Sequence, residues 1–329
     1  MKRRILFVTT DYSYFTLPIT QPLQRMGFIV KVFDYYKPNL LARLVGWSSN
    51  RHFLPKSWLP RVINFSLLFQ VKAFKPNYLL VIKGDTLTDS TLKAINQLGT
   101  VTINWFPDWL VSWRWLRAYA LLYTVFLNSC YNTYAQLTRK GINNYYLPYA
   151  APIAKRRIKL AKRYNVTFVG QHSPRRERYF KYIADLGLDI WGYDRWAQTS
   201  LAHLWHGPTS QAQTQTIIAQ SKIVVNILTG TDSFQPAAVN IRTFEALSAG
   251  SFLLVKYHPI LNRHFKVGKE LITFTTPQDL RRKVKYYLSH EAEREKIATA
   301  GYNRILRHHT FDQRLHQLFK LVDKHASIT

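Results

Sequence analysis

An arginine lies in the first turn of the helix predicted by VNIRTFEALSAG, residues 239–250. If Asn240 is the N-cap, Arg242 takes the second helical position, where the helix dipole disfavours a cation and favours an anion. Glu245 lies three residues further along, and its carboxylate could accept hydrogen bonds from vicinal hydroxyls, as acidic residues do with ribose. The pattern therefore indicates an anion site beside a hydroxyl-binding acid. An ion pair of Arg242 and Glu245 on a solvated surface explains it equally well.

A second candidate is TFVGQHSPRRERYF, residues 167–180, in which a strand, a glycine, a short polar loop and a helix follow one another. Gly170 would let another group approach the backbone closely, and Arg175 or Arg176 could bind a phosphate. A plain turn between a strand and a basic helix is an equal alternative. The chain contains neither GxGxxG nor GxxxxGK[ST], which disfavours a dehydrogenase-type dinucleotide fold and a P-loop nucleotidase.

Further candidates come at the ends of other predicted strands. Tyr193 could stack on a base, whereas Trp191 in the same run is expected in the core. Asp108 follows the run INWFP and Asp11 ends the first strand, so each is either a salt-bridged structural residue, which we favour, or a general base. The sequence has no HExxH, GxSxG or EF-hand pattern and no histidine spacing typical of metal ligands, so we expect no protein-bound metal.

The elements that would position these residues alternate along the chain. Residues 86–99 are typical of a helix that ends on a glycine. Apolar runs typical of strands in a covered parallel sheet are residues 4–11, 28–36, 78–85, 100–108 and 123–129, and then 165–171, 188–193, 222–228, 251–258 and 271–276. This alternation predicts an α/β fold.

The alternation breaks at KRRIKLAKR, where six of nine residues are basic. We therefore predict two Rossmann-like, doubly wound domains, an N-terminal one over residues 1–152 and a C-terminal one over 165–308, joined by a basic linker over 153–164. The tail looks helical throughout, and residues 309–329 are expected to form a closing helix that packs back on the first domain. Ligands of open α/β sheets bind at the carboxyl ends of the strands, so the two domains are expected to face each other across a functional cleft.

The chain is strongly basic, because 46 Lys and Arg against 18 Asp and Glu give a formal charge of +28. Such a charge attracts polyanions, and it leaves nucleic acid, an anionic membrane surface and acidic glycans or phosphorylated lipids all open. The single Cys130 excludes an internal disulfide, and the apolar run near the N-terminus is shorter than a signal peptide needs. Because no apolar run approaches about 20 residues, we expect a cytoplasmic protein, peripheral on the inner face of the cell membrane.

Two long segments contain no acidic residue. Residues 35–84 hold eight Lys or Arg, and residues 109–176 hold twelve. Within the first, residues 47–74 mix Trp, Phe and Leu with cations, which is typical of membrane-interface segments. An ordinary buried helix with a basic outer face is at least as good an interpretation.

Most of the chain resembles the GT-B glycosyltransferases, specifically the bacterial group-1-like set that includes the CgeB-type spore-maturation proteins. The resemblance is strongest in the second half, in NVTFVGQHSPRRERYF, DIWGYDRW, NIRTFEALSAGSFLLV and VKYYLSHEAEREKIATAGYNRILRHHTFDQRL. It is weaker in YLLVIKGDTLTDSTL and INWFPDW of the first half.

The resemblance implies a hexosyltransferase-like enzyme whose second domain binds a nucleotide-sugar donor, a UDP- or GDP-sugar, as substrate, with no bound cofactor. Glu245 would hold the ribose hydroxyls, and Asn240, Arg242 and the Gly170 loop would hold the diphosphate and sugar. Arg175 and Tyr193 are placed on the same donor side. Arg242 would also stabilise the charge on the departing nucleoside diphosphate without a metal.

The first domain would receive the acceptor, an envelope glycan, a lipid-linked glycan or another anionic group, with Asp11 and Lys83 on this side and Asp108 as the base. One feature departs from the resemblance: retaining members often carry two glutamates eight positions apart, and the position eight before Glu245 is Ala237. The alternatives are a basic nucleic-acid-binding protein, which we consider less fitting, and an inactive protein that only binds a sugar nucleotide.

Overall fold

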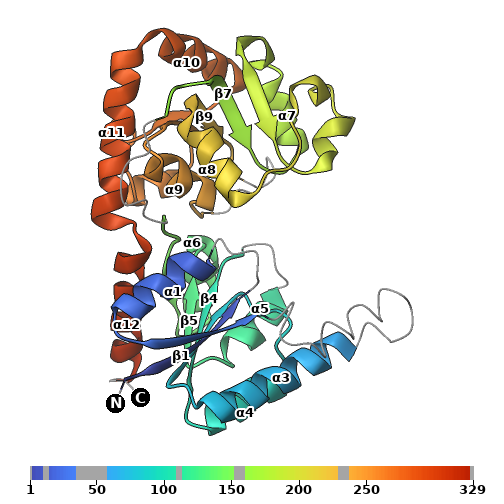
Figure 1. The fold of residues 1–329 in the computed structure, drawn as a ribbon, viewed down its shortest axis with the longest axis vertical. Coiled ribbons are helices and arrows are strands. Elements are labelled where there is room, and N and C mark those ends of the chain that lie inside the picture. Colours follow the sequence, from blue (N-terminus) through green and yellow to red (C-terminus); the bar gives the residue numbers. More distant parts are fainter. Residues whose placement is uncertain are drawn as a thin grey trace. The chain divides into compact units, whose positions relative to one another are not determined.

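The computed structural model describes residues 2–9, 15–34, 58–108, 113–151, 160–228 and 237–326 of the chain. The chain divides into two compact units, each with its own parallel sheet (Figure 1). The first unit consists of Met1–Pro148 together with Arg314–Thr329, and the second of Tyr149–Gln313.

The sheet of the first unit has the strand order β2-β1-β3-β4-β5-β6, and every pair of neighbours is parallel. Every residue of β3 and β5 is buried, as expected of strands in a sheet covered on both faces. The strands are β1 (Arg4–Thr9), β2 (Ile29–Asp34), β3 (Tyr78–Ile82), β4 (Val101–Phe106), β5 (Val125–Asn128) and β6 (Tyr145–Tyr146).

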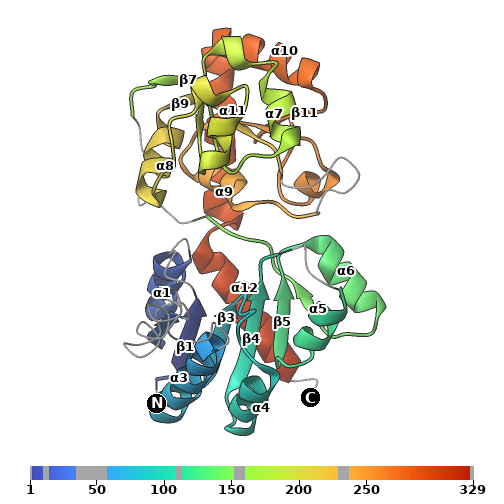
Figure 2. The ribbon, with the colours of Figure 1, turned by 90° about the vertical axis from the view of Figure 1, so that its right-hand side faces the viewer.

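Helices pack on this sheet from two sides. Figure 2 shows α3 and α4 in front of the strands and α12 behind them. On the α3 side, Leu67, Leu92 and Leu116 belong to one apolar cluster with alternate residues of the strands, whereas Phe319 of α12 stacks on Phe28 at 4.8 Å between ring centroids. The helices are α1 (Thr16–Arg25), α3 (Trp58–Phe74), α4 (Asp89–Gln97), α5 (Trp113–Ala120), α6 (Tyr131–Arg139) and α12 (Phe311–Ala326), of which residues 314–326 lie in this unit.

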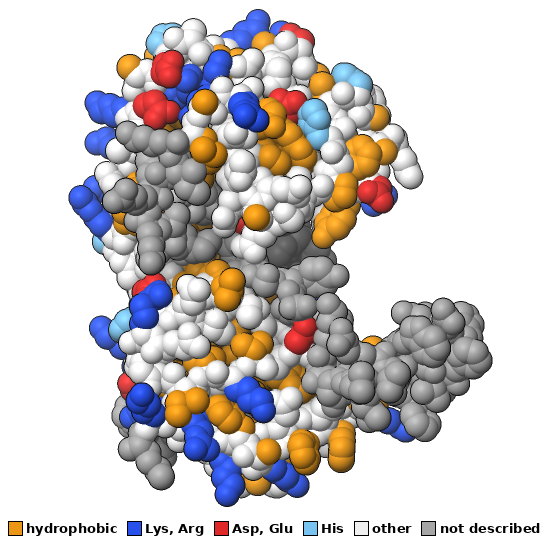
Figure 3. All heavy atoms as spheres, viewed as in Figure 1, with side chains coloured by type: hydrophobic (Ala, Val, Ile, Leu, Met, Phe, Trp, Pro, Cys, Tyr) orange, Lys and Arg blue, Asp and Glu red, His pale blue; other side chains and the backbone are white. Residues whose placement is uncertain are grey.

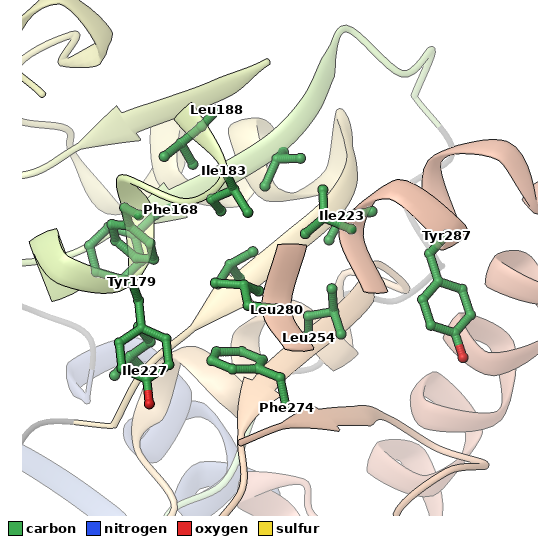
Figure 4. Close-up of a cluster of buried hydrophobic side chains, with 14 of the residues drawn as sticks. Phe168, Tyr179, Ile183, Leu188, Ile223, Ile227, Leu254, Phe274, Leu280 and Tyr287 are labelled. Carbon is green, nitrogen blue, oxygen red and sulfur yellow. The ribbon is translucent and has the colours of Figure 1, made fainter. Parts of the chain in front are cut away.

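The second unit contains a five-stranded parallel sheet in the order β11-β10-β9-β7-β8. Figure 4 shows its core, in which side chains of β7 and β9 meet those of α7 and α10. The strands are β7 (Tyr164–Val169), β8 (Leu188–Trp191), β9 (Ser221–Asn226), β10 (Phe252–Lys256) and β11 (Ile272–Phe274). The helices are α7 (Pro174–Phe180), α8 (Gln211–Ala219), α9 (Ile241–Ser248), α10 (Pro277–Ser289) and α11 (Glu291–His308).

The two sheets share one strand order. Numbered from its own first strand, each runs 2-1-3-4-5, and β6 extends the first sheet by one strand. The winding therefore reverses between β1 and β3 in the first unit and between β7 and β9 in the second. In open α/β sheets, ligands bind beyond the carboxyl ends of the strands at such reversal points. The loops after β3, β7 and β9 are thus the places to look for chemistry.

The predicted α/β class with two parallel, doubly wound sheets is confirmed. Each predicted apolar run contains a strand, the tail from residue 277 to 326 is helical apart from short breaks, and Trp191 is buried in the core as expected. Strand β6 is too short and too polar in context to have been predicted. The domain boundaries stay a prediction. Within the described ranges, no helix is both long enough and apolar enough to cross a membrane.

Candidate functional site

Helix α9 begins at the residue that the sequence predicts. The side chain of Asn240 caps it by accepting a hydrogen bond from the Thr243 amide at 3.2 Å. The same side chain exchanges hydrogen bonds with Asn226, at 2.8 Å and 3.1 Å. Because Asn226 ends β9 and is buried, these contacts fix the start of α9 to the carboxyl end of the sheet. The Asn240 side chain thereby positions the helix N-terminus.

The Arg242 guanidinium lies beside this N-terminus. Its Nε donates to the carbonyl of Val169, the last residue of β7, at 3.1 Å, and its NH1 lies 2.5 Å from Oε2 of Glu245. The side chains of Arg242 and Glu245 are 20% and 4% exposed. The ion pair considered in the sequence is therefore present, but it is largely buried instead of solvated.

Burial dominates the electrostatics of Glu245. It raises the pKa of the carboxyl above its usual value, and the Arg242 charge and hydrogen bond oppose that shift only in part. A carboxylate in such a place is costly unless further donors reach it. Ligand hydroxyl groups would supply such donors, which is the role that the sequence predicts for Glu245.

Arg176 joins the loop after β7 to the end of β9. It donates to the carbonyl of Ile227 at 2.8 Å and to that of Gln171 at 2.6 Å, and its guanidinium lies 5.1 Å from the Phe168 ring centroid. Burial, followed by the charges of Arg242 and Arg175, lowers the pKa of Arg176 to about 10. This arginine is a structural tie as well as a source of positive charge.

Positive charge thus accumulates at the winding reversal of the second sheet. Arg175 and Arg176 are both buried, and Arg242 is close enough to depress the pKa of Arg176. Glu245 is the carboxylate paired with Arg242 in this group. Three guanidinium groups repel one another at low dielectric, so each of them would stabilise an anion bound among them.

Gly170 serves the packing of its loop. A Cβ at this position would lie 2.9 Å from the Phe168 ring, and the Gly170 carbonyl accepts a hydrogen bond from the Trp196 indole at 2.9 Å. That carbonyl also fills the place of a side chain at Gly192, since a Cβ there would lie 2.1 Å from it. Phe168 and Gly192 therefore pack closely against the Gly170 backbone, and the role of this loop in holding a diphosphate stays a prediction.

His172 and Glu177 form a side-chain hydrogen bond in this loop. Nε2 of His172 lies 3.0 Å from Oε2 of Glu177, and the imidazole packs edge-on against Trp196. The bond to His172 is the main reason why the pKa of Glu177 is lowered to about 2, and Ser200 and Lys181 add to it. The Nδ1 atom of His172 is buried without a hydrogen-bond partner.

Tyr193 stands apart from this group. It follows β8 and its side chain is 68% exposed. Among the described contacts, none joins it to Arg242 or Glu245. The stacking role predicted for Tyr193 stays a prediction.

In the first unit, the loop after β3 has a strained backbone. Lys83 adopts a left-handed conformation with φ of 65°, which disfavours residues other than glycine, and Gly84 follows with φ of 73°. The carbonyl of Lys83 accepts hydrogen bonds from the side chains of Asn104, at 2.9 Å, and Tyr119, at 3.3 Å. Strain held in place by such contacts is typical of functional loops.

The Lys83 side chain brings two acids together. Its Nζ lies 3.1 Å from Oδ2 of Asp108, which follows β4, and 3.4 Å from Oδ2 of Asp85. Burial lowers the pKa of Lys83, but the two carboxylates outweigh it and raise the pKa above its usual value. Each of the three side chains is about 40% exposed. Lys83 and Asp108, both predicted on the acceptor side, therefore meet beyond the carboxyl ends of β3 and β4.

Asp11, which the sequence predicts on the acceptor side, lies outside the described residues. In the described part of the chain, no group of three or more His, Cys, Asp or Glu side chains could hold a metal ion.

Residues 175–320 match a family model described as Glycosyl transferase-like. No curated protein sequence matches the chain significantly. Three solved structures share its architecture. Sucrose-phosphate synthase from Thermosynechococcus elongatus matches with a TM-score of 0.68 and 11% identity, and a glycosyltransferase from Rickettsia africae with a TM-score of 0.65 and 8% identity, each over all of both chains. Anabaena HepE in complex with UDP and glucose matches with a TM-score of 0.64 and 10% identity, over 98% of this chain and all of that one. Residues 175–320 are therefore glycosyltransferase-like, and the chain has the GT-B fold of these structures. The CgeB-type group stays a prediction.

Several residues of the two candidate loops, one in each unit, were not singled out from the sequence. His172, Asn226 and Asp85 are single polar residues whose partners are 5, 14 and 2 positions away. A signal was available for two of them, since Asn226 and Asp85 come at or just after strand ends. The structural role of Arg176 had no signal, because its partners are backbone carbonyls.

Proposed function

We propose that the protein is a hexosyltransferase that moves a sugar from a UDP- or GDP-sugar to an envelope glycan, a lipid-linked glycan or another anionic acceptor, without a metal ion. The observation that carries the proposal is the buried pair of Arg242 and Glu245 at the start of α9, beside the end of β7. It combines a site for an anion with an acceptor for hydroxyls, and a nucleoside diphosphate presents both groups.

The donor would bind in the second unit. The diphosphate would lie at the α9 N-terminus, where Arg242 and the first amides of the helix offer donors, and Arg175 would add charge. Glu245 would accept hydrogen bonds from the ribose, and exposed Tyr193 could stack on the base. HepE, which has the same fold, is known in complex with UDP-glucose, and this supports a UDP-sugar as the donor class.

The reaction would join the acceptor to the sugar in one exchange of bonds. An acceptor hydroxyl oxygen bonds to the anomeric carbon while that carbon's bond to the diphosphate breaks, and the hydroxyl proton passes to a base. We assign the base to Asp108, with Lys83 orienting its carboxylate. Negative charge then grows on the diphosphate oxygen, where the Arg242 guanidinium stabilises it. Asp11 is proposed on the acceptor side as well.

The place of action would be the cytoplasmic face of the cell membrane. The charge of +28 favours an anionic surface over a neutral one. This location depends on composition, and it is independent of the donor site.

Titration calorimetry with UDP and GDP tests the donor site. We expect saturable binding of at least one of them. In Glu245→Gln, the affinity for that nucleotide should fall about tenfold because the ribose loses a charged acceptor, whereas inorganic pyrophosphate should bind as before. Glu291→Gln is the matched control, since the Glu291 side chain is 78% exposed at the start of α11.

Turnover separates the proposed enzyme from its alternatives. Release of UDP or GDP from a panel of nucleotide sugars, in the presence of an envelope extract, supports a transferase. Binding without release would indicate an inactive sugar-nucleotide-binding protein. Tight, strongly salt-dependent binding of DNA or RNA with no nucleotide binding would replace the proposal with a nucleic-acid-binding protein.

A further inference from the structure

Helix α3 exposes two aromatic side chains to solvent. Phe65 is 71% exposed and Phe69 is 66% exposed, and among the other large apolar side chains of the described residues only Tyr193, at 68%, and Leu121, at 66%, are as exposed as Phe69. They are four residues apart, so they lie on one face of the helix, one turn from each other. Exposed single apolar residues are common, but an adjacent pair of phenylalanines on a helix indicates a contact surface.

The opposite face of α3 already has a partner. Ile63, Leu67 and Val71 are buried, at most 2% exposed, in the core cluster of the first unit. Asn64 binds the backbone of the neighbouring loop through the carbonyl of Thr86 at 2.9 Å. The helix is therefore fixed by its inner face, and the outer phenylalanines contribute nothing to that packing.

Cations flank the exposed pair. Arg61 and Lys72 are exposed, and their spacing of four residues before Phe65 and three after Phe69 places them on the same helix face. At the carboxyl end of the helix, Arg4 and Lys31 lie over the Phe74 ring at 5.7 Å and 5.8 Å. Helix α3 contains no acidic residue. We name the face formed by Arg61, Phe65, Phe69 and Lys72 the α3 outer face.

The neighbouring helix α4 has a different surface. Its exposed residues include Asp89, Lys93 and Gln97, with both signs of charge and no aromatic side chain. Figure 3 shows apolar and basic side chains next to one another over the part of the first unit where Figure 1 places α3. Exposed phenylalanines flanked by cations are therefore found on α3 and not on its neighbour α4.

We propose that the α3 outer face docks on an anionic lipid membrane, with Phe65 and Phe69 inserted at the headgroup level and Arg61 and Lys72 paired with lipid phosphates. Interfacial helices combine apolar and basic residues in this way, because long cationic side chains reach the headgroups while the aromatic rings enter the apolar boundary. A symmetric contact between two copies is disfavoured, since it would bring the same cations of both chains together. The inference rests on the proposed function only for the biological role of docking.

Vesicle co-sedimentation of the full chain tests the proposal. We expect binding to vesicles of phosphatidylcholine mixed with phosphatidylglycerol, weak binding to phosphatidylcholine alone, and loss of binding at high salt. The double variant Phe65→Ser/Phe69→Ser should bind at least about tenfold more weakly. The matched control is Lys93→Ser/Gln97→Ser on α4, which should bind as the natural protein does.

A fluorescent label reports insertion directly. Cys130 is 1% exposed, so a polarity-sensitive dye can be attached to a cysteine placed at Phe69 in Phe69→Cys, with Gln97→Cys as the control. Anionic vesicles should shift the emission of the dye at position 69 to shorter wavelength and leave that at position 97 unchanged. Equal shifts at both positions, or none at 69, would refute docking through α3.

Other outcomes decide between partners. If the natural chain forms dimers that Phe65→Ser/Phe69→Ser abolishes, the α3 outer face is a self-association surface and the proposal is wrong. Equal binding to neutral and anionic vesicles would also overturn it. The double variant should keep its UDP or GDP affinity. Failure of nucleotide binding in the natural chain would remove the proposed function and leave vesicle binding standing.

Discussion

The two sheets have the same winding, but the loops at their reversal points differ in burial. In the second unit, Arg242 and Glu245 meet with side chains that are 20% and 4% exposed. In the first, Lys83 and Asp108 meet with side chains about 40% exposed, on a backbone that is itself strained. A buried charged group is fixed before a ligand arrives, whereas an exposed one can adapt to it. In the function that we propose, this difference would give the diphosphate a preformed site and the acceptor an adaptable one.

The largest expected effect is on folding. Arg176→Met leaves the carbonyls of Ile227 and Gln171 without their donor, so it should lower the free energy of unfolding by about 3–5 kcal/mol. Lys83→Met removes only exposed ion pairs and should lower it by less than about 1 kcal/mol. Urea unfolding of both variants measures the difference. Similar losses in the two variants would mean that burial does not separate the two regions.

Nucleotide affinity should respond to one region alone. Arg242→Lys keeps the charge but loses the forked donor, so UDP or GDP affinity should fall about 10- to 100-fold. Asp108→Asn should leave that affinity within about twofold of the natural value, because we assign Asp108 to the acceptor. Titration calorimetry measures both. A comparable loss of nucleotide affinity in Asp108→Asn would refute the assignment of the two regions to donor and acceptor.

The hydrogen bonds of Glu177, at the start of α7, should give a pH-dependent stability. The pKa of Glu177 is lowered from 4.5 to about 2 in the folded state, so its stabilising contribution is complete above pH 4.5 and is lost as the pH falls from there toward 2. Glu177→Gln should unfold about 1–3 kcal/mol more easily at neutral pH, with the difference shrinking below pH 4.5. Urea unfolding across this range measures it. A difference that does not depend on pH would show that charge plays no part.

The smallest expected effect concerns the backbone of Lys83. A glycine adopts φ of 65° without strain, whereas alanine does not. Lys83→Gly should therefore be more stable than Lys83→Ala by about 1 kcal/mol, although both lose the same ion pairs. Thermal unfolding of the two variants gives the comparison. If Lys83→Ala is the more stable of the two, the strained loop makes no energetic contribution.

Local patterns were sufficient to predict the elements. Apolar runs buried on both faces predict β3 and β7, and Asn240 followed by an apolar period predicts α9. These signals depend on residues close in the chain, where steric and hydrogen-bonding preferences act directly. The alternation of strands and helices also predicts that both sheets are parallel, whereas the order of the strands within each sheet comes from the structure.

The partners within the site could not be predicted in the same way. The bond from Arg242 to the Val169 carbonyl spans 73 positions, and the bond from Arg176 to the Ile227 carbonyl spans 51. Such contacts depend on which strands become neighbours, and every residue offers a carbonyl, so the sequence carries no mark of them. The burial of Glu245 was missed for the same reason: its surroundings come from distant strands.

Gly192 influences the candidate site only by leaving room for a neighbouring carbonyl group. It carries no side chain, yet a methyl group at this position would displace the Gly170 carbonyl and with it the turn that presents Arg175. A screen of random substitutions that measures only glycosyl-transfer activity would therefore identify Gly192 as if it contacted the substrate. Separating such scaffold positions from true contacts requires that folding and nucleotide binding be recorded for every variant along with turnover.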